Sequence, residues 1–300
     1  MLEGVKAMGY TDPTPIQLRA IPLVMEGRDI IGSAQTGTGK TAAFALPILT
    51  RLNTHERATR ALILEPTREL AAQVETAFRD YSRFTDLKVA VFYGGVGYDK
   101  QLQALKTGVD VIVATPGRLL DHMEQGNCDL SHVQHVVLDE ADRMLDMGFI
   151  HDVKKVLALL PAEKQSLLFS ATFSDDIRAL ATQLLQQPQH IQVTPANTTV
   201  QLIQQVIHPV GRNQKKALLA HIIESKQWSQ VLVFCRTKFG ANHVADFLNK
   251  QGITAMALHG NKSQTARTQA LAGFKSGDIR VLRSEEHTSE LQSHHDLVCR

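Results

Sequence analysis

Short apolar runs alternate with helix-like segments along the first part of the chain. The runs are rich in β-branched residues, end in turn residues and occupy 28–33, 61–66, 88–95, 109–117, 135–142 and 165–172. Segments between them, such as 67–84 and 152–160, show a helical spacing of apolar residues. Nearly continuous apolar strands that alternate with helices are typical of a parallel sheet covered on both faces. The pattern therefore predicts an α/β fold.

This pattern stops at a polar stretch, 192–199, and then starts again. The stretch reads QVTPANTT, has no helical periodicity and indicates a linker. Beyond it, new strand-like runs occupy 230–237, 254–260 and 278–282. We therefore expect two α/β units, residues 1–191 and 200–282. The second has room for only about three strand–helix repeats.

Composition narrows the class of protein without identifying a function. Hydrophobic residues make up 43% of the chain, which suits packed cores and argues against disorder. No apolar run approaches the ~20 residues of a membrane span, and the N-terminus lacks the pattern of a signal peptide. Cys128, Cys235 and Cys299 are unevenly spaced, which favours reduced thiols and a cytoplasmic location. A net charge of +2 neither demands nor excludes a polyanionic partner.

A glycine-rich segment, AQTGTGKT at 34–41, follows the first strand-like run and opens a helix-like segment. Ligands of open parallel sheets bind outside the carboxyl ends of the strands, where this segment lies. Its small residues let consecutive backbone N–H groups surround phosphate oxygens, and the helix N-terminus adds a favourable dipole. Lys40 would reach the β- and γ-phosphates, and Thr41 would place its hydroxyl on Mg²⁺. The predicted nucleotide-binding residues here are Ala34, Gln35, Thr36, Gly37, Thr38, Gly39, Lys40 and Thr41.

An apolar run that ends in acidic residues, VVLDEAD at 136–142, is the expected partner of this loop. The Asp139 carboxylate would hold Mg²⁺, usually through water, and Glu140 would orient and deprotonate the attacking water. Each segment also has a simpler interpretation. The glycine-rich segment, in which Ala34 stands where the strict phosphate-loop pattern has glycine, could be only a turn that caps a helix, and acidic clusters often cap helices as well. Their occurrence together, each after a strand, favours hydrolysis of ATP or GTP with Lys40, Asp139 and Glu140 as catalytic residues.

Ten short motifs in a fixed order give the chain its resemblance to a known family. They are TPIQ (14–17), AQTGTGKT (34–41), PTRELA (66–71), GG (94–95), TPGR (115–118), DEAD (139–142), SAT (170–172), VLVFCRTK (231–238), LHG (258–260) and QTAR (264–267). Over about residues 1–282 the chain resembles the DEAD-box ATP-dependent RNA helicases, and among them most resembles the bacterial RhlE type. The resemblance implies two RecA-like parallel-sheet domains, the first nearly complete and the second truncated.

The resemblance implies ATP and Mg²⁺ as cofactors and RNA as the partner. Gln17, with Tyr10 and Thr14 nearby, would read the adenine and so select ATP over GTP. ATP would bind between the two domains and draw them together over single-stranded RNA, which bends one strand and separates a short duplex. Two other classes stay open. One is a non-catalytic clamp that ATP holds on RNA, and the other is a phosphate-loop DNA translocase.

Contacts to RNA are also carried over from the resemblance. Ser170 and Thr172 would hydrogen-bond to Asp142 and couple the nucleotide state to RNA binding. The residues implied to line the RNA path are Thr67, Arg68, Gly94, Gly95, Thr115, Arg118, Arg236, Thr237, Gln264 and Arg267. Each loop alone would be interpreted as a helix cap or a tight turn. Glycines, however, let phosphates approach the backbone closely, and arginines offer forked hydrogen-bond donors. Few aromatic residues stand near these loops, so we expect a grip on phosphates and 2′-hydroxyls and not on stacked bases.

Both ends of the chain depart from the family pattern. The aromatic residue that the family places upstream of TPIQ to stack on adenine is missing, so the N-terminus looks truncated. Beyond residue 282 the family's ATD…ARGxD and HRxGRxxR motifs are also missing. Those motifs carry arginines that reach the γ-phosphate, and an arginine finger is worth roughly 10³–10⁵ in rate. We therefore expect negligible ATP hydrolysis by this polypeptide, although its full-length parent is an active helicase.

The last segment, 283–300, does not continue the apolar pattern of the strand before it. Its residues RSEEHTSELQS back-translate to a nucleotide sequence that matches a common sequencing-library adapter. A metal site is the alternative, but His287, His294, His295 and Cys299 lack any standard zinc spacing. We therefore predict that this segment is not a biological part of the protein.

Overall fold

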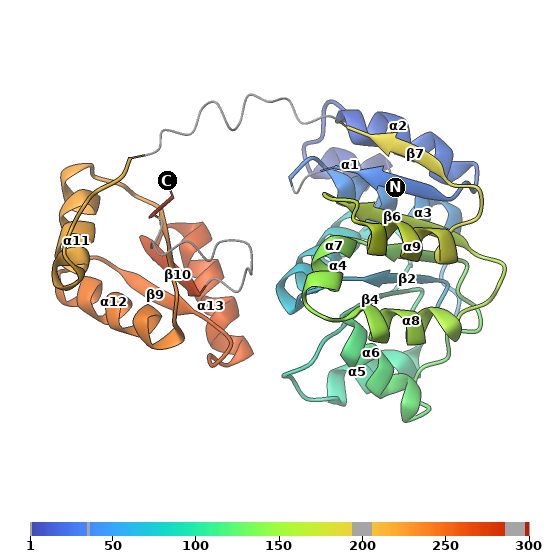
Figure 1. Ribbon diagram of the computed structural model, residues 1–300. Helices are drawn as coiled ribbons and strands as arrows, with labels where there is room; N and C mark the ends of the chain where they lie inside the picture. Colours follow the sequence, from blue (N-terminus) through green and yellow to red (C-terminus); the bar gives the residue numbers. More distant parts are fainter. Residues whose placement is uncertain (1, 35–36, 194–205, 286–297, 300) are drawn as a thin grey trace. The chain divides into compact units, whose positions relative to one another are not determined.

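The computed structural model describes residues 2–34, 37–193, 206–285 and 298–299 of the chain (Figure 1). The chain divides into two compact units, Met1–Leu202 and Ile203–Arg300. Strands and helices alternate in both units, so the α/β fold predicted from the hydrophobic pattern is confirmed.

The first unit is built on a seven-stranded sheet in which all the described pairings are parallel. Its strands are β1 (Ile30–Ser33), β2 (Ala61–Leu64), β3 (Val89–Phe92), β4 (Val111–Ala114), β5 (His135–Leu138), β6 (Gln165–Ser170) and β7 (Gln189–Gln192). Their order across the sheet is β3-β4-β2-β5-β6-β1-β7. Each of the strands β1 to β6 is shorter than the run that predicted it, because polar residues at one or both ends of these runs form the loops beyond the sheet.

Helices cover both faces of this sheet (Figure 1). They are α1 (Leu2–Ala7), α2 (Pro15–Met25), α3 (Lys40–Leu52), α4 (Arg68–Ser82), α5 (Asp99–Thr107), α6 (Pro116–Glu124), α7 (Ala141–Asp146), α8 (Ile150–Ala158) and α9 (Asp175–Leu184). Alternate residues of a strand serve opposite faces. Ala61 and Ile63 of β2 pack in one hydrophobic cluster, and Leu62 and Leu64 pack in the other. This double burial explains why β2 is apolar at every position.

A close contact joins β1 to the aromatic core on one face of the sheet. The rings of Phe44 and Phe169 pack with their centroids 5.5 Å apart. A Cβ on Gly32 would lie 2.5 Å from the Phe169 ring, so glycine is the residue that lets this ring lie over β1. The contact accompanies a parallel register in which Ser33 of β1 lies beside Ser170 of β6.

Strand β7 is a strand that the sequence pattern did not predict. Of its residues only Ile191 is buried, so β7 has no apolar run to reveal it. It pairs with β1 through Gln192, and Val193 donates a further backbone hydrogen bond to the β1 strand. Gln192 therefore belongs to the sheet, although the sequence placed it in the linker 192–199. The linker from residue 194 onward lies outside the described residues.

The second unit has a smaller sheet. Strands β8 (Val231–Cys235), β10 (Val281–Glu285) and β9 (Ala255–Leu258) pair in parallel in that order, and β11 (Val298–Cys299) runs antiparallel on β8. The other elements are η1 (Arg212–Gln214), α11 (Lys215–Ser225), α12 (Lys238–Lys250) and α13 (Gln264–Ser276). Ile223, Val233 and Leu248 belong to its hydrophobic core. All three strands predicted for this unit are present. In the described sheet, β9 is an edge strand.

Strand β10 extends past the domain boundary predicted at residue 282. Arg283 is buried, and it pairs with both neighbouring strands in continuous parallel register. Backbone pairing to two strands does not require apolar side chains, so the polar start of segment 283–300 continues the strand. Residues 286–297 and 300, which include the three histidines of the segment, lie outside the described part. The non-biological origin of the segment stays a prediction.

A buried carboxylate ties together the loops at the amino ends of β2, β3 and β4. Asp110 accepts hydrogen bonds from the backbone N–H groups of Glu56 and Lys88, both at 2.8 Å. It also accepts one from the Arg60 guanidinium at 2.6 Å and lies 2.7 Å from His55 Nδ1. Burial by itself raises the pKa of Asp110, but these donors outweigh burial and the pKa is lowered.

Asp110→Asn should lower the free energy of unfolding of the first unit by about 1–3 kcal/mol, because the buried Arg60 loses its buried partner and keeps only the ion pair with the exposed carboxylate of Glu56. The loss should shrink as the pH falls. A carboxylate with a lowered pKa contributes stability above its unfolded-state pKa and loses that contribution when it is protonated in the fold.

Urea unfolding followed by tyrosine fluorescence measures this unit, because all four tyrosines of the chain lie in it. Asp12→Asn, at an exposed position, is the matched control. An equal loss in both variants would contradict the role given to Asp110.

Candidate nucleotide and RNA site

The carboxyl ends of the central strands bring the two predicted nucleotide motifs into contact. Lys40, the first residue of α3, lies with its Nζ 3.4 Å from Oδ1 of Asp139, which directly follows β5. Both side chains are buried, with 5% and 8% exposed. Burial raises the pKa of Asp139, the Lys40 ammonium opposes this shift, and neighbouring Glu140 adds to it. The sequence predicted that these two segments, about 100 residues apart, act together at one site.

The phosphate loop has the backbone that a phosphate cradle requires. Gly37 and Gly39 both have positive φ, +83° and +88°, and Gly39 is the residue that caps α3. Ala34, where the strict pattern has glycine, is buried and its N–H donates to the Ser170 carbonyl at 3.3 Å. Thr38 and Thr41 are half-buried. The remaining predicted loop residues, Gln35 and Thr36, lie outside the described residues.

The TPIQ segment is fastened to this loop by one side-chain amide. Gln17 Oε1 accepts a hydrogen bond from the Thr14 backbone N–H at 2.9 Å, and Gln17 Nε2 donates to the Gly39 carbonyl at 3.2 Å. A Cβ on Gly39 would lie only 2.6 Å from that nitrogen, so the contact requires glycine. Tyr10, the third predicted adenine-reading residue, is partly exposed, and its hydroxyl lies 3.1 Å from the Tyr81 hydroxyl. Its role toward adenine stays a prediction.

Glu140 has a strained backbone. Its φ and ψ of +52° and +50° lie in the left-handed region, which L-residues other than glycine, asparagine and aspartate rarely adopt. Its N–H donates to Asp139 Oδ1 at 2.9 Å, and its carboxylate lies 3.3 Å from the Arg143 guanidinium. Such strain is found at functional sites, where the surrounding structure holds it in place. Here it turns the chain sharply from β5 into α7.

Mg²⁺ suits the residues at this place. The ion prefers oxygen ligands, and in nucleotide sites one or two carboxylates suffice because the phosphates and water supply the rest. The Asp139 carboxylate and the Thr41 hydroxyl are such donors. Within the part of the chain that the structure describes, no group of three or more His, Cys, Asp or Glu side chains could hold a metal ion by itself. A metal here would depend on the bound nucleotide.

Glu65 is a residue of the site that the sequence reasoning missed. It directly follows β2, is fully buried, and neither of its carboxyl oxygens has a hydrogen-bond partner among the described residues. Burial raises its pKa well above the usual value; Asp139 and Glu140 add to the shift, and Lys40 opposes it. The strand register, which the sequence does not show directly, brings Glu65 to the site. Leu64 pairs with Leu138, so the residues that follow them, Glu65 and Asp139, are neighbours.

The three residues expected to couple nucleotide and RNA are hydrogen-bonded to one another. Thr172 donates to Asp142 Oδ2 from both its backbone N–H and its hydroxyl, each at 2.9 Å. The Asp142 N–H donates to Ser170 Oγ at 3.3 Å, and Ser170 Oγ donates in turn to the Thr172 carbonyl at 2.7 Å. Asp142 lies in the first turn of α7, two residues after Glu140. The loops after β5 and β6 are therefore joined beside the nucleotide motifs.

The predicted RNA contacts of the first unit also gather at one place. A Cβ on Gly94 would lie 3.7 Å from the Arg68 guanidinium and 4.0 Å from that of Arg118. A Cβ on Gly95, which has a φ of +79°, would clash with Arg68. Thr67 caps α4 by accepting a hydrogen bond from the Leu70 N–H. Arg68 is half-buried beside the exposed loop of the glycine pair, so its guanidinium and the loop share a surface.

Two residues predicted to line the RNA path are buried and contact protein. Arg118 is 8% exposed, and its guanidinium donates to the Val96 carbonyl at 3.1 and 3.2 Å. It also lies 4.2 Å from the centre of the Tyr98 ring. Thr115 is buried as well, with its N–H bonded to the Phe92 carbonyl. Arg118 thus holds the loop that follows the glycine pair, and the sequence could not show that its charge is used internally.

The second unit contains the other predicted RNA contacts. Arg236 and Thr237 follow β8 and are exposed, and Thr237 Oγ1 caps α12 by accepting a hydrogen bond from the Gly240 N–H at 3.0 Å. Gln264 begins α13, and Arg267 lies one turn further along; both are half-buried.

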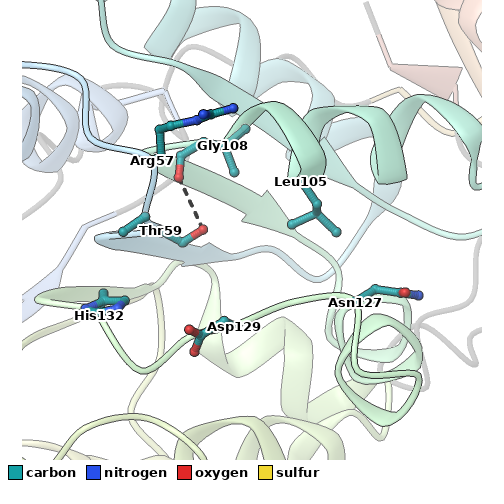
Figure 2. Close-up of a pocket in the computed structure, with 9 residues that line it drawn as sticks. Arg57, Thr59, Leu105, Gly108, Asn127, Asp129 and His132 are labelled. Carbon is teal, nitrogen blue, oxygen red and sulfur yellow. Dashed lines mark hydrogen bonds between the residues drawn. The ribbon is translucent and has the colours of Figure 1, made fainter.

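A small pocket lies at the amino ends of the strands of the first unit, opposite the carboxyl ends that carry the nucleotide motifs (Figure 2). Its volume is about 220 Å³, and Arg57, Asp129 and His132 are among the residues that line it. These residues precede the strands β2 and β5, and the dashed bond in Figure 2 joins the Thr59 hydroxyl to the Val109 carbonyl at 3.2 Å. None of the predicted site residues lines this pocket. It is therefore separate from the nucleotide motifs.

Glu65→Gln should make the stability of the first unit less dependent on pH. A carboxyl whose pKa is raised in the fold costs stability as the pH rises above its unfolded-state pKa, because the unfolded chain ionises first. The unfolding free energy of the variant relative to the unchanged chain should rise between about pH 5 and pH 8. Urea titrations across that range measure it, with Glu163→Gln at an exposed position as control; parallel curves would refute it.

Comparison with known proteins matches both units to helicases. Residues 14–180 match the DEAD/DEAH box helicase family, and residues 214–286 match the helicase conserved C-terminal domain. The DEAD-box ATP-dependent RNA helicase CshA of Geobacillus kaustophilus is 42% identical over 282 residues, which are 94% of this chain and 60% of that protein. The ATP-dependent RNA helicase DeaD of Buchnera aphidicola is 42% identical over 283 residues, or 94% of this chain and 47% of that protein.

Solved structures give the same assignment. A DEAD box protein from Methanococcus jannaschii is 38% identical with a TM-score of 0.62, over 95% of this chain and 77% of that chain. A Saccharomyces cerevisiae Dbp5 variant bound to RNA and ADP BeF3 is 32% identical with a TM-score of 0.84, over 95% of this chain and 73% of that chain. In the described residues no helix is both long and apolar enough to cross a membrane.

The curated relatives limit how finely the chain is classified. They are of the CshA and DeaD types, so the resemblance to the RhlE type stays a prediction, and the chain spans only about half of their length. The helicase match over residues 14–180 alone covers more than half of the chain. Together with the seven-stranded parallel sheet and the Lys40–Asp139 contact, it shows that the chain belongs to the DEAD/DEAH box helicase family.

Proposed function

We propose that the protein to which this chain belongs is an ATP-dependent RNA helicase that grips the RNA backbone without sequence preference and locally separates short duplexes. The observation that carries the proposal is a chain of contacts at one sheet edge. Lys40 contacts Asp139, and Asp142 three residues later is hydrogen-bonded to Thr172. The groups suited to a nucleotide and the groups suited to RNA are thus only a few residues apart.

ATP binding rests on the phosphate loop and the TPIQ segment. The Lys40 ammonium, held at the base of the loop by Asp139, is placed to bind phosphate oxygens at the helix N-terminus. Gln17, which already bonds to Gly39, positions the adenine-reading segment against the loop. ATP would be selected over GTP if the side-chain amide of Gln17 exchanged its hydrogen bonds within the protein for hydrogen bonds to the adenine edge. The relative named CshA is described as ATP-dependent, and the Dbp5 variant holds ADP BeF3.

Hydrolysis is assigned to the residues after β5. Mg²⁺, held through Asp139 and Thr41, would supply charge stabilisation to the phosphates. The Glu140 carboxylate, which lies 3.3 Å from the Arg143 guanidinium, would orient a water molecule and take its proton. Burial of Lys40 and Asp139 strengthens their interactions with the nucleotide, because little water screens them.

RNA binding is assigned to loops of both units. In the first unit, Arg68 beside Gly94 and Gly95 offers a forked donor next to backbone that phosphates approach closely. Arg118 acts indirectly by holding this loop through Val96. In the second unit, the assigned RNA contacts are Arg236, Thr237, Gln264 and Arg267. Contacts to phosphate and 2′-hydroxyl groups would separate RNA from DNA.

Arg68→Ala should weaken binding to single-stranded RNA about equally for all sequences and reduce the salt dependence of binding by about one phosphate contact. Arg79→Ala is the matched control, because Arg79 lies on the same helix and its side chain is 63% exposed in an ion pair with Glu75. Fluorescence anisotropy with labelled RNA at several salt concentrations measures both. Equal affinities of the two variants would remove Arg68 from the RNA path.

The 300-residue chain itself should hydrolyse ATP negligibly even with saturating RNA, because its sequence contains neither arginine motif of the family beyond residue 282. Phosphate release from the chain, and from a longer version that restores those motifs, measures the difference. An RNA-stimulated turnover near ~1 per second for the 300-residue chain, within the usual range of enzymes, would disprove this.

Strand separation distinguishes the helicase from the clamp. The longer version should separate a short RNA duplex only with ATP, whereas a pure clamp would bind RNA with ATP and leave the duplex intact. A single-stranded DNA competitor of the same sequence should displace RNA poorly; equal competition would favour the DNA translocase.

A further inference from the structure

An aromatic pair stands exposed on the first turns of α12 in the second unit. Phe239 is 72% exposed, although large apolar side chains in this chain are otherwise mostly buried. Its ring packs against the imidazole of His243, one turn further along, with centroids 4.2 Å apart and planes inclined by 43°. His243 is also exposed. One side of the Phe239 ring is thus supported by His243, and most of its area faces solvent.

The pair lies next to the residues assigned to RNA. Phe239 is two residues from Thr237, the cap of α12, and three from Arg236. Lys238 Nζ donates to Asn261 at 3.3 Å, which joins the first turn of α12 to the loop after β9. That loop leads directly into α13, which begins at Gln264 and carries the predicted contact Arg267. The ring therefore stands at the border of one continuous surface formed by α12 and the loop after β9.

Basic residues predominate on this surface around the ring, and the exposed Asp246 lies about one turn beyond His243 on α12. Residues 229–245 contain Arg236 and Lys238 and no acidic residue, and residues 253–277 contain Lys262, Arg267 and Lys275 and no acidic residue. A basic surface with an exposed aromatic ring is what single-stranded nucleic acids require, because the cations bind the backbone and the ring stacks on a base. A docking protein needs a broader apolar area, of several hundred Å², than one ring and an imidazole provide.

We propose that Phe239, supported by His243, stacks on a base of single-stranded RNA beside the backbone contacts of the second unit. The inference rests on the proposed function and goes beyond it, because it adds a contact to a base where the loops of the motifs contact only the backbone. Stacking on an aromatic ring tolerates every base, so this contact adds affinity and strand preference without reading sequence. It also favours unpaired nucleotides over a duplex, whose bases are stacked on each other.

Substitution at Phe239 tests the contact in the full chain. Phe239→Ala and Phe239→Leu should both weaken binding to a labelled single-stranded RNA by about 5- to 100-fold, the usual effect of losing one stacked base. Phe239→Tyr should retain most of the affinity. Phe84→Ala, at an aromatic residue of the first unit that is 53% exposed, should bind as the unchanged chain does. The fold is checked by the fluorescence of Trp228, which packs against the core of the second unit.

An RNA of the same length with abasic nucleotides separates stacking from other causes. The unchanged chain should lose affinity for the abasic RNA, and Phe239→Ala should bind both RNAs alike. Phe239→Trp adds a direct reading, since its fluorescence should be quenched by the RNA with bases and not by the abasic one. Unchanged affinity of Phe239→Ala and Phe239→Leu, or an equal loss on both RNAs, would overturn the inference and point to a protein partner for this ring. Failure of the unchanged chain to bind RNA at all would instead overturn the proposed function.

Discussion

Parallel register in the first unit is the constraint on which the site depends. β2, β5, β6 and β1 pair so that Leu64 lies beside Leu138 and Ser33 lies beside Ser170. The strands consequently end at one edge, and the loops that follow them lie close together. A slip of one residue would turn every side chain of a strand to the other face, where it would meet a different set of core residues. The two hydrophobic cores that fix the register therefore also fix the distance from Lys40 to Asp139.

Much of this arrangement could be predicted from the sequence, because apolar runs and polar strand ends are local signals. The parallel sheet, the phosphate loop and its acidic partner all came from such signals. The rest depended on tertiary context. β7 has one buried residue and so no pattern, and β10 continues through Arg283 because its neighbours offer backbone partners. Arg118 looks like any surface arginine until the structure shows its guanidinium bonded to Val96.

Glu65 marks another limit of reasoning from sequence. A glutamate in LILEP reads as the first polar residue after a strand, and its burial becomes evident only from the register that sets it beside Asp139. Glu65 and Asp139 then share one ammonium, that of Lys40, while the carboxylate of Glu140 beside them contacts the Arg143 guanidinium. Burial first, and the neighbouring carboxyl groups in addition, raise the pKa of Glu65 and of Asp139. In the proposed function, a nucleotide-bound cation would offset the negative charge of this place.

The bond from the Ala34 N–H to the Ser170 carbonyl has a consequence for how the two ends of the proposed mechanism communicate. Ala34 opens the phosphate loop and Ser170 opens the segment bonded to Asp142, yet their strands are direct neighbours. Adjacent strands lie about 4.8 Å apart. In the proposed function, a displacement of the loop by a phosphate would therefore reach the hydrogen bonds between Ser170 and Asp142 across a single peptide hydrogen bond. Such a displacement would pass directly from one strand to its paired neighbour, so it would need no chain of side-chain contacts.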